Sequence, residues 1–169
     1  GWLYLFLFTV IAYSARGLRF KEKPFLDSLT SASHFVGPSV FGLSLAGANL
    51  ADPALLPYFG AFTLWGVASH AFGAVQDVRA DREGGIASIA TVIGARNTVR
   101  FAFVAYLVAA GLVALAGMPN LLWAAVPYLV IVGRHWNITD VTCEDANRGW
   151  KLFIWLNFFA GAVVTLAWI

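Results

Sequence analysis

The stretch Leu55–Gln76 reads "LLPYFGAFTLWGVASHAFGAVQ", and the residues that follow it, Asp77–Gly85, read "DVRADREGG". The first stretch is a largely apolar run of the length that a helix needs to cross a membrane, about 20 residues. The second places two aspartates four residues apart at the end of that run. We therefore predict a membrane-spanning helix that ends in a charged motif.

The composition of the chain supports a membrane protein. Of its 169 residues, 60% are hydrophobic and 12% are charged, proportions that water-soluble domains of this size rarely show. Its 11 basic and 9 acidic residues nearly balance, so the bulk charge gives no reason to expect a nucleic-acid partner. One cysteine, Cys143, cannot build a disulfide framework, and we interpret it as structural.

Apolar runs separated by charged connections predict an all-α, polytopic transmembrane bundle of about six helices. Neither an internal repeat nor a linker divides the sequence, which predicts one membrane domain over residues 1–169. The first and fifth runs are short for a crossing. The predicted crossings are Gly1–Tyr13, Leu26–Ala46, Leu55–Gln76, Val99–Gly117, Leu121–Gly133 and Lys151–Ile169.

The basic residues fall at three connections, and the intervening connections "GANLADP" and "GMPN" contain none. In a bundle of six crossings these three connections lie on one face, which the positive-inside rule assigns to the cytoplasm. We therefore expect an integral membrane protein whose charged motif lies at the cytoplasmic face. The three basic groups are Arg16, Arg19, Lys21 and Lys23; Arg79, Arg82, Arg96 and Arg100; and Arg134, Arg148 and Lys151.

The aspartate motif is the first candidate site. On a helix Asp77 and Asp81 lie about one turn apart on the same face, where their charges repel unless a cation lies between them. Mg²⁺ is commonly held by one or two carboxylates together with substrate phosphates, and Arg79 and Arg82 offer further contacts to a diphosphate. The alternative is a solvated loop in which the acids pair with these neighbouring arginines.

The first basic connection is the second candidate site. Its four basic residues lie on the same predicted face as the aspartates, so they are candidates to bind a diphosphate without a metal: Arg16, Arg19, Lys21 and Lys23. Tyr13, which precedes them, offers a phenol to a phosphate oxygen or a cation. The alternatives are a basic cluster that only sets topology and a tyrosine of the interfacial aromatic belt.

Polar residues inside the apolar runs leave two interpretations open. His70 precedes Asp77 by seven residues, which places His70, Asp77 and Asp81 along one stripe if the helix continues. Ionisable groups at membrane depth are candidates for function. His34, His70 and Asn157 can equally serve as hydrogen-bonding contacts between helices.

Three segments together resemble the UbiA superfamily of intramembrane prenyltransferases: "YSARGLRFKEKPFLDSLTSASHFV", "HAFGAVQDVRADREGGIASIATVIGA" and "NRGWKLFIWLNFFAGAVVTLAWI". The phrases "KPFLDSL" and "GAVQDVRADREGGIASIATVIGA" most resemble the lycopene elongase branch, which makes C50 carotenoids. The resemblance implies Mg²⁺-dependent transfer of a prenyl group from an allylic diphosphate to a lipophilic acceptor in the membrane. For the elongase branch the donor is dimethylallyl diphosphate, the acceptor is lycopene, and water adds a tertiary hydroxyl.

The resemblance also implies roles for individual residues. Asp77 and Asp81 match the second of the two Asp-rich motifs that hold Mg²⁺, and Tyr13, Arg19 and Lys21 match the family's tyrosine and basic cluster. Asp77, Asp81 and Tyr13 are then the catalytic residues. The sequence departs from the family in having Arg16-Gly17 where a Pro-Pro pair is common, which leaves the shape of that connection open.

The family's first Asp-rich motif is absent from the sequence. A fold of nine crossings would carry that motif near its second, so the six predicted crossings match the last six. We therefore expect a C-terminal fragment, inactive in prenyl transfer on its own because half of its metal site is missing.

Two alternative functions remain at this stage. A UbiA-type enzyme acting on an aromatic or quinone precursor, haem, chlorophyllide or a glycerol ether would carry the same motif. A transporter or channel segment would use Asp77 and Asp81 to bind a transported cation, although the repeats and broken helices typical of transporters are not evident. P-loop, GxSxG and HExxH motifs are absent, so the sequence gives no support for P-loop, serine-hydrolase or zincin chemistry.

Overall fold

The computed structural model describes residues 1–167, and within them every regular secondary-structure element is a helix. Two short helices, α4 (Val78–Glu83) and α5 (Ile89–Ile93), lie between the third and fourth long helices. The connections carry the 3₁₀ turns η1 (Phe20–Glu22), η2 (Pro53–Leu55), η3 (Pro119–Leu121) and η4 (Cys143–Asp145). The long helices are α1 (Trp2–Ser14), α2 (Leu26–Leu45), α3 (Leu56–Val75), α6 (Ala95–Leu115), α7 (Leu122–Gly133) and α8 (Ala146–Leu166).

The predicted all-α bundle of about six helices is confirmed. The bounds of α1, α2 and α3 agree with the predicted crossings to within one residue. Helices α6 and α8 begin earlier than predicted, at Ala95 and Ala146, because their polar first turns continue the helix beyond the apolar run. The last predicted crossing extends to residues 168–169, which lie outside the described residues.

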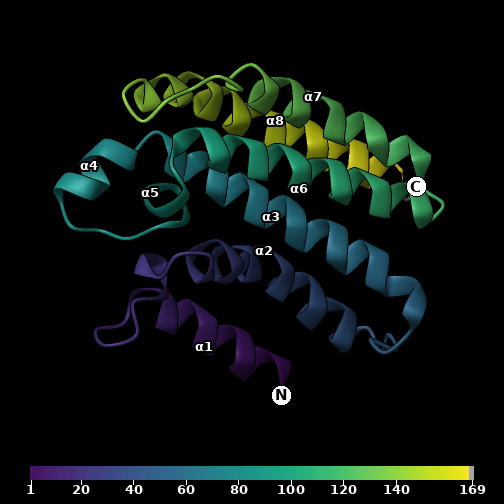
Figure 1. Ribbon diagram of the computed structural model, residues 1–169. Coiled ribbons are helices and arrows are strands. Elements are labelled where there is room, and N and C mark those ends of the chain that lie inside the picture. The colour runs from purple at the N-terminus through teal and green to yellow at the C-terminus, as the bar shows by residue number, and fades with distance from the viewer. Residues whose placement is uncertain (168–169) are drawn as a thin grey trace.

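Helix α3 lies at the centre of the arrangement (Figure 1). It packs against α2 on one side and against α6 and α8 on the other, while α1 lies on α2 and α7 contacts both α6 and α8. Close approach depends on small residues. A Cβ added at Gly66 of α3 would lie 2.9 Å from the Cα of Ala32 in α2, so only glycine fits this crossing.

The core lies among α3, α6, α7 and α8, whereas large apolar side chains on the outer helices are exposed. Trp155 and Phe158 of α8 are 74% and 72% exposed, which suits contact with lipid. By length and composition, the segments Ala95–Leu115 and Cys143–Leu166 are candidate membrane spans. Among the described residues, α1 and α7 are shorter than a full span, and α2 and α3 are long enough but less apolar.

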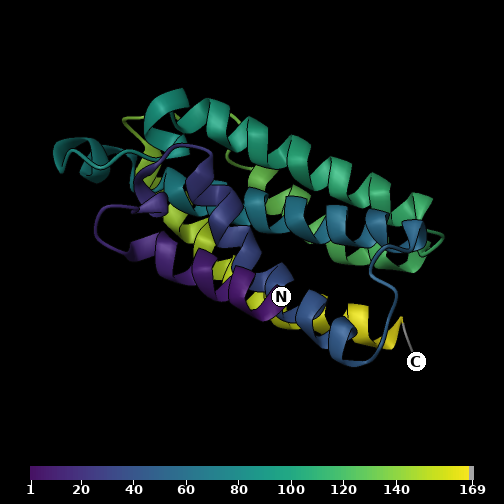
Figure 2. The ribbon, with the colours of Figure 1, turned by 90° about the horizontal axis from the view of Figure 1, so that it is seen from below.

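The three charged connections gather at one end of the bundle, as the sequence predicts (Figure 1, Figure 2). In both views α4 projects beyond the ends of the long helices. Side-chain contacts join the connections: Asp27 binds the backbone of Ile89, and Arg82 binds Asp140. We call this region the charged end, defined as residues 13–28, 76–98 and 134–148. Its assignment to the cytoplasmic face stays a prediction.

Candidate active site at the charged end

The aspartate motif lies beyond the end of α3. Helix α3 ends at Val75, and Asp77 precedes α4 with backbone angles of φ −98° and ψ 0°, outside the helical region. The Asp77 N–H bonds to the Ala74 carbonyl at 3.2 Å, a tightened final turn, and the Asp81 N–H bonds to the Asp77 carbonyl at 2.8 Å. The two aspartates are therefore one helical turn apart, as predicted.

The stripe expected along one continuous helix through His70, Asp77 and Asp81 is wrong, because the helix is interrupted at Gln76 and Asp77. Aspartate favours the start of a helix over its interior, since its short carboxylate competes for backbone N–H groups. The interruption separates His70, which remains in α3, from the motif that α4 carries.

Neither carboxylate of the motif has a protein partner within residues 1–167. Asp77 lies at the surface and Asp81 is half-buried, and neither side chain makes a hydrogen bond or an ion pair there. Partial burial raises the pKa of Asp77, and burial together with the charge of Asp77 raises the pKa of Asp81. A bound cation would relieve this repulsion.

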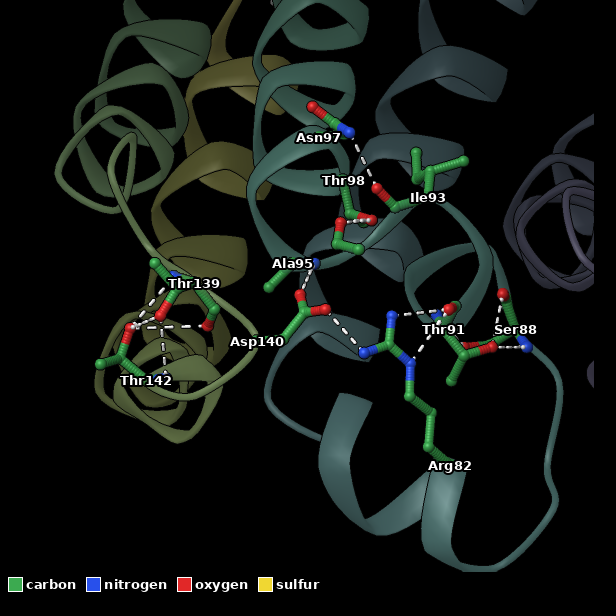
Figure 3. A network of polar contacts seen from close by, with 11 residues as sticks. Arg82, Ser88, Thr91, Ile93, Ala95, Asn97, Thr98, Thr139, Asp140 and Thr142 are labelled. Carbon is green, nitrogen blue, oxygen red and sulfur yellow. Dashed lines mark hydrogen bonds and ion pairs between the residues drawn. The ribbon is translucent and has the colours of Figure 1, made fainter.

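The neighbouring arginines bind other acids instead, and Figure 3 shows the contacts of Arg82. Arg82 Nη1 donates to Asp140 Oδ2 at 2.6 Å, and Arg82 Nε and Nη2 donate to the Thr91 carbonyl at 3.2 and 2.8 Å. Arg79 Nη1 lies 3.4 Å from Glu144 Oε1. The alternative in which the motif's acids pair with their own arginines is therefore not what the structure contains.

Asp140 connects α4 to the start of α6. Its Oδ1 accepts the backbone N–H of Ala95 at 2.7 Å, and this bond, with the Arg82 contact, holds the pKa of Asp140 below its usual range. Gly94 has φ +80°, and a Cβ there would lie 3.2 Å from Asp140 Oδ1. Glycine is thus required both for the turn between α5 and α6 and for the approach of the carboxylate.

Tyr13 belongs to a partly buried hydrogen-bonded chain, which we call the Tyr13–Asp27 chain: Tyr13, His70, Ser28 and Asp27. Tyr13 Oη lies 3.4 Å from His70 Nε2, and His70 Nδ1 lies 3.1 Å from Ser28 Oγ. Ser28 Oγ donates to Asp27 Oδ1 at 3.3 Å. His70 thus contacts two neighbouring helices, as one of its two interpretations requires.

Sequence reasoning missed Asp27 and Ser28 as site residues. Asp27 is fully buried, and its carboxylate also accepts the backbone N–H groups of Ser28 at 2.7 Å and Ile89 at 2.9 Å. The available signal was an acidic residue in the first turn of an otherwise apolar helix, where its charge is favoured.

The basic connection after α1 is ordered by local contacts. Arg19, with φ +40°, forms an ion pair with Glu22, and Lys23 Nζ lies 5.1 Å from the centre of the Phe20 ring. Arg16 is exposed and Lys21 is half-buried. This geometry puts Arg19 and Lys21 at the charged end and leaves their binding of a diphosphate a prediction.

The other two polar residues in the apolar runs, Asn157 and His34, differ in their hydrogen bonding. Asn157 Oδ1 accepts the hydroxyl of Tyr128 at 2.8 Å, which joins α8 to α7. His34 packs edge-on against Tyr13 with ring centres 5.2 Å apart, and its buried Nε2 has no hydrogen-bond partner among the described residues.

The residues present fit part of a magnesium site. Within residues 1–167, no group of three or more His, Cys, Asp or Glu side chains is arranged to hold a metal ion. Asp77 and Asp81 offer two unpaired carboxylates one turn apart, which is the protein contribution typical of Mg²⁺ sites that also use substrate phosphates and water.

Comparison with known proteins finds one matching family and several relatives. The chain matches the UbiA prenyltransferase family over residues 1–161. It is 52% identical over 169 residues to the lycopene elongase/hydratase of Corynebacterium glutamicum, covering 98% of this chain and 58% of that protein. It is 53% identical over 168 residues to the C(50) beta-cyclic carotenoids biosynthesis protein LbtBC of Dietzia sp., covering 97% and 38%.

A more distant relative extends the match to archaea. The lycopene elongase/hydratase of Halobacterium salinarum is 32% identical over 169 residues, covering 98% of this chain and 58% of that protein. The chain thus spans less than two thirds of the length of these relatives. No solved structure matches. The predicted resemblance to UbiA proteins and to their lycopene elongase branch is confirmed, and the chain belongs to the UbiA prenyltransferase family.

Proposed function

We propose that the protein carrying this chain transfers the prenyl group of dimethylallyl diphosphate to an end of lycopene within the membrane, and that the transfer depends on Mg²⁺. The observation that carries the proposal is the pair of unpaired carboxylates, Asp77 and Asp81, whose neighbouring arginines, Arg79 and Arg82, contact Glu144 and Asp140 instead. Relatives at 52% and 32% identity that are named lycopene elongase/hydratase support the choice of acceptor. Membership in a prenyltransferase family argues against a cation transporter.

In this proposal Asp77 and Asp81 hold Mg²⁺, which supplies positive charge to the departing diphosphate. The chain offers two carboxylates, so the remaining coordination positions belong to the diphosphate, to water and to the further Asp-rich segment expected from the family. Arg19 and Lys21 bind diphosphate oxygens from the connection after α1. Tyr13 faces the cation that forms when the diphosphate leaves.

The two arginines near the motif contribute unequally. Arg79 makes one long contact with Glu144, at 3.4 Å on the surface, and exchanges it for a phosphate at little cost. Arg82 holds Asp140 and the Thr91 carbonyl with three bonds, so it reaches a diphosphate only by giving these up. Of the two, Arg79 is therefore the readier diphosphate ligand.

The test is product analysis in a lycopene-producing bacterial host that expresses the complete protein. We expect carotenoids of 45 and 50 carbons, and in isolated membranes we expect their formation to stop with a chelator and resume with Mg²⁺. Unchanged lycopene, with the protein present in the membrane, would contradict the proposal. Assays with quinone, haem and lipid precursors would then identify another acceptor.

A further inference from the structure

The Tyr13–Asp27 chain has a defined direction. As a carboxylate, Asp27 only accepts hydrogen bonds, so Ser28 Oγ gives its single proton to Asp27 Oδ1. Ser28 Oγ must then accept from His70 Nδ1, which therefore carries the ring proton. In a neutral imidazole the other nitrogen is an acceptor, so the Nε2 lone pair points to the hydroxyl of Tyr13.

The chain runs from a fully buried end to a half-buried end. Asp27 and Ser28 are fully buried, and both oxygens of Asp27 are occupied by backbone N–H groups as well as by Ser28. His70 and Tyr13 are only half-buried. Tyr13 is the next-to-last residue of α1, close to the basic connection. The acceptor end of the chain is thus the end that a substrate can approach.

We propose that His70 is the proton acceptor for addition of water to the prenylated acceptor, with Tyr13 contacting the water and with Asp27 and Ser28 as positioning residues. The inference rests on the proposed function. Attack of the acceptor's terminal double bond on the prenyl cation leaves a tertiary cation on the acceptor. The water oxygen forms a C–O bond to that carbon, and its O–H bond breaks to leave a tertiary alcohol. The released proton passes to Tyr13 Oη as the tyrosine's own proton moves to His70 Nε2.

The charge created in this step is balanced within the chain. Protonation makes His70 an imidazolium with both nitrogens donating, and Nδ1 already donates toward Ser28 and the buried carboxylate of Asp27. A buried carboxylate that fixes the tautomer of a histidine and stabilises its cation is an established arrangement for general bases. When no base is positioned on the adding water, the tertiary cation instead loses a neighbouring C–H proton to water and gives an alkene.

The experiment compares hydroxylated and dehydrated products of the complete protein in a lycopene-producing host. His70→Ala removes the proposed proton acceptor. Ser28→Ala removes the hydroxyl that contacts His70 Nδ1. Ser33→Ala is the matched control, because Ser33 Oγ also joins α2 to a neighbouring helix, at 3.0 Å from Thr9 Oγ1, but lies outside the chain. The ratio of alcohol to alkene is independent of the amount of folded protein, so a purely structural defect does not change it.

We expect His70→Ala to lower the alcohol-to-alkene ratio about 10²-fold while elongated carotenoids still form, since general bases contribute at least this factor. Ser28→Ala should lower the ratio about tenfold, as loss of a partner that orients a histidine commonly does. Ser33→Ala should leave the ratio at the wild-type value.

Several outcomes would overturn the inference. One is an unchanged ratio in His70→Ala. Another is complete loss of elongated product with the variant protein present in the membrane, which would place His70 in an earlier step. A wild-type protein that yields elongated carotenoids without hydroxyl groups would also overturn the inference. Failure of the proposed function looks different, because the wild type then makes no elongated carotenoid at all.

Discussion

Four of the five aspartates at the charged end fall into two pairs, and the fifth, Asp145, is exposed and makes no capping hydrogen bond with its side chain. Asp27 and Asp140 each have both carboxylate oxygens occupied, by backbone N–H groups together with Ser28 or Arg82. Asp77 and Asp81 have no side-chain partner within residues 1–167. The difference also appears in acidity, since the pKa of Asp140 is lowered whereas the pKa values of Asp77 and Asp81 are raised.

The comparison separates carboxylates that hold the structure from those available to a ligand. Asp27 fixes the first residue of α5, Ile89, and Asp140 fixes the first residue of α6, Ala95. These bonds flank the segment that follows α4 and hold it against the bundle. The motif of Asp77 and Asp81 precedes this segment. It carries two repelling charges, an arrangement that costs stability unless a cation binds.

The largest expected effect comes from removing one charge of the motif. Asp77→Asn or Asp81→Asn in the complete protein should lower the Mg²⁺-dependent rate of prenyl transfer by about 10²–10³-fold, the size expected when one group that stabilises a leaving charge is lost. The measurement is elongated carotenoid formed by isolated membranes at saturating Mg²⁺.

The matched control for this prediction is Asp145→Asn. Asp145 is exposed at the same end of the bundle, carries the same charge and makes no capping hydrogen bond with its side chain. It should retain the wild-type rate. If both motif variants keep more than about a tenth of the wild-type rate, Asp77 and Asp81 are not metal ligands in the sense proposed.

Asp27 is the buried member of the pair Asp27 and Asp140, and it should contribute more to the stability of the fold than Asp140 does. Asp27→Ala leaves the N–H groups of Ser28 and Ile89 without acceptors, and each unsatisfied buried donor costs about 1–3 kcal/mol. Asp27→Asn retains one acceptor oxygen and should cost less. Unfolding of the two variants in detergent micelles measures the difference, and equal stability of Asp27→Ala and wild type would show that Asp27 does not hold α5.

The pH dependence of the Mg²⁺ requirement should show an effect of intermediate size. In the proposed site Mg²⁺ would bind the ionised forms of Asp77 and Asp81, and their raised pKa values mean that protons compete at higher pH than for ordinary aspartates. As pH falls through these raised values, the Mg²⁺ concentration for half-maximal rate should rise, by up to about tenfold per pH unit for each proton displaced. An Mg²⁺ requirement that stays constant down to the ordinary aspartate range would contradict the raised values.

The same comparison shows where sequence reasoning succeeds. Apolar runs fix the six long helices, because length and hydropathy decide whether a segment spans, and the spacing of Asp77 and Asp81 fixes their separation of one turn. The third crossing was predicted to end at Gln76, but the separate helix α4 that begins at Val78 was not foreseen, because the expected stripe through His70, Asp77 and Asp81 requires one continuous helix. The Tyr13–Asp27 chain depends on residues 42 and 57 positions apart, and such contacts arise only when the helices pack.

The smallest expected effect concerns Arg82 and Asp140. Their ion pair is about half exposed, with 44% and 40% of the two side chains accessible, so the pair itself should contribute only about 0.2–1 kcal/mol in a double-mutant cycle of Arg82→Met and Asp140→Asn. Asp140→Asn alone should cost about 1 kcal/mol, because it weakens an N-terminal helix contact to Ala95 as well as the ion pair. A coupling energy well above this range would mean that the pair is part of a larger network. In that case Arg82 would be a structural residue that never releases Asp140 for a diphosphate, and Arg79 would be the arginine of the motif that meets the substrate.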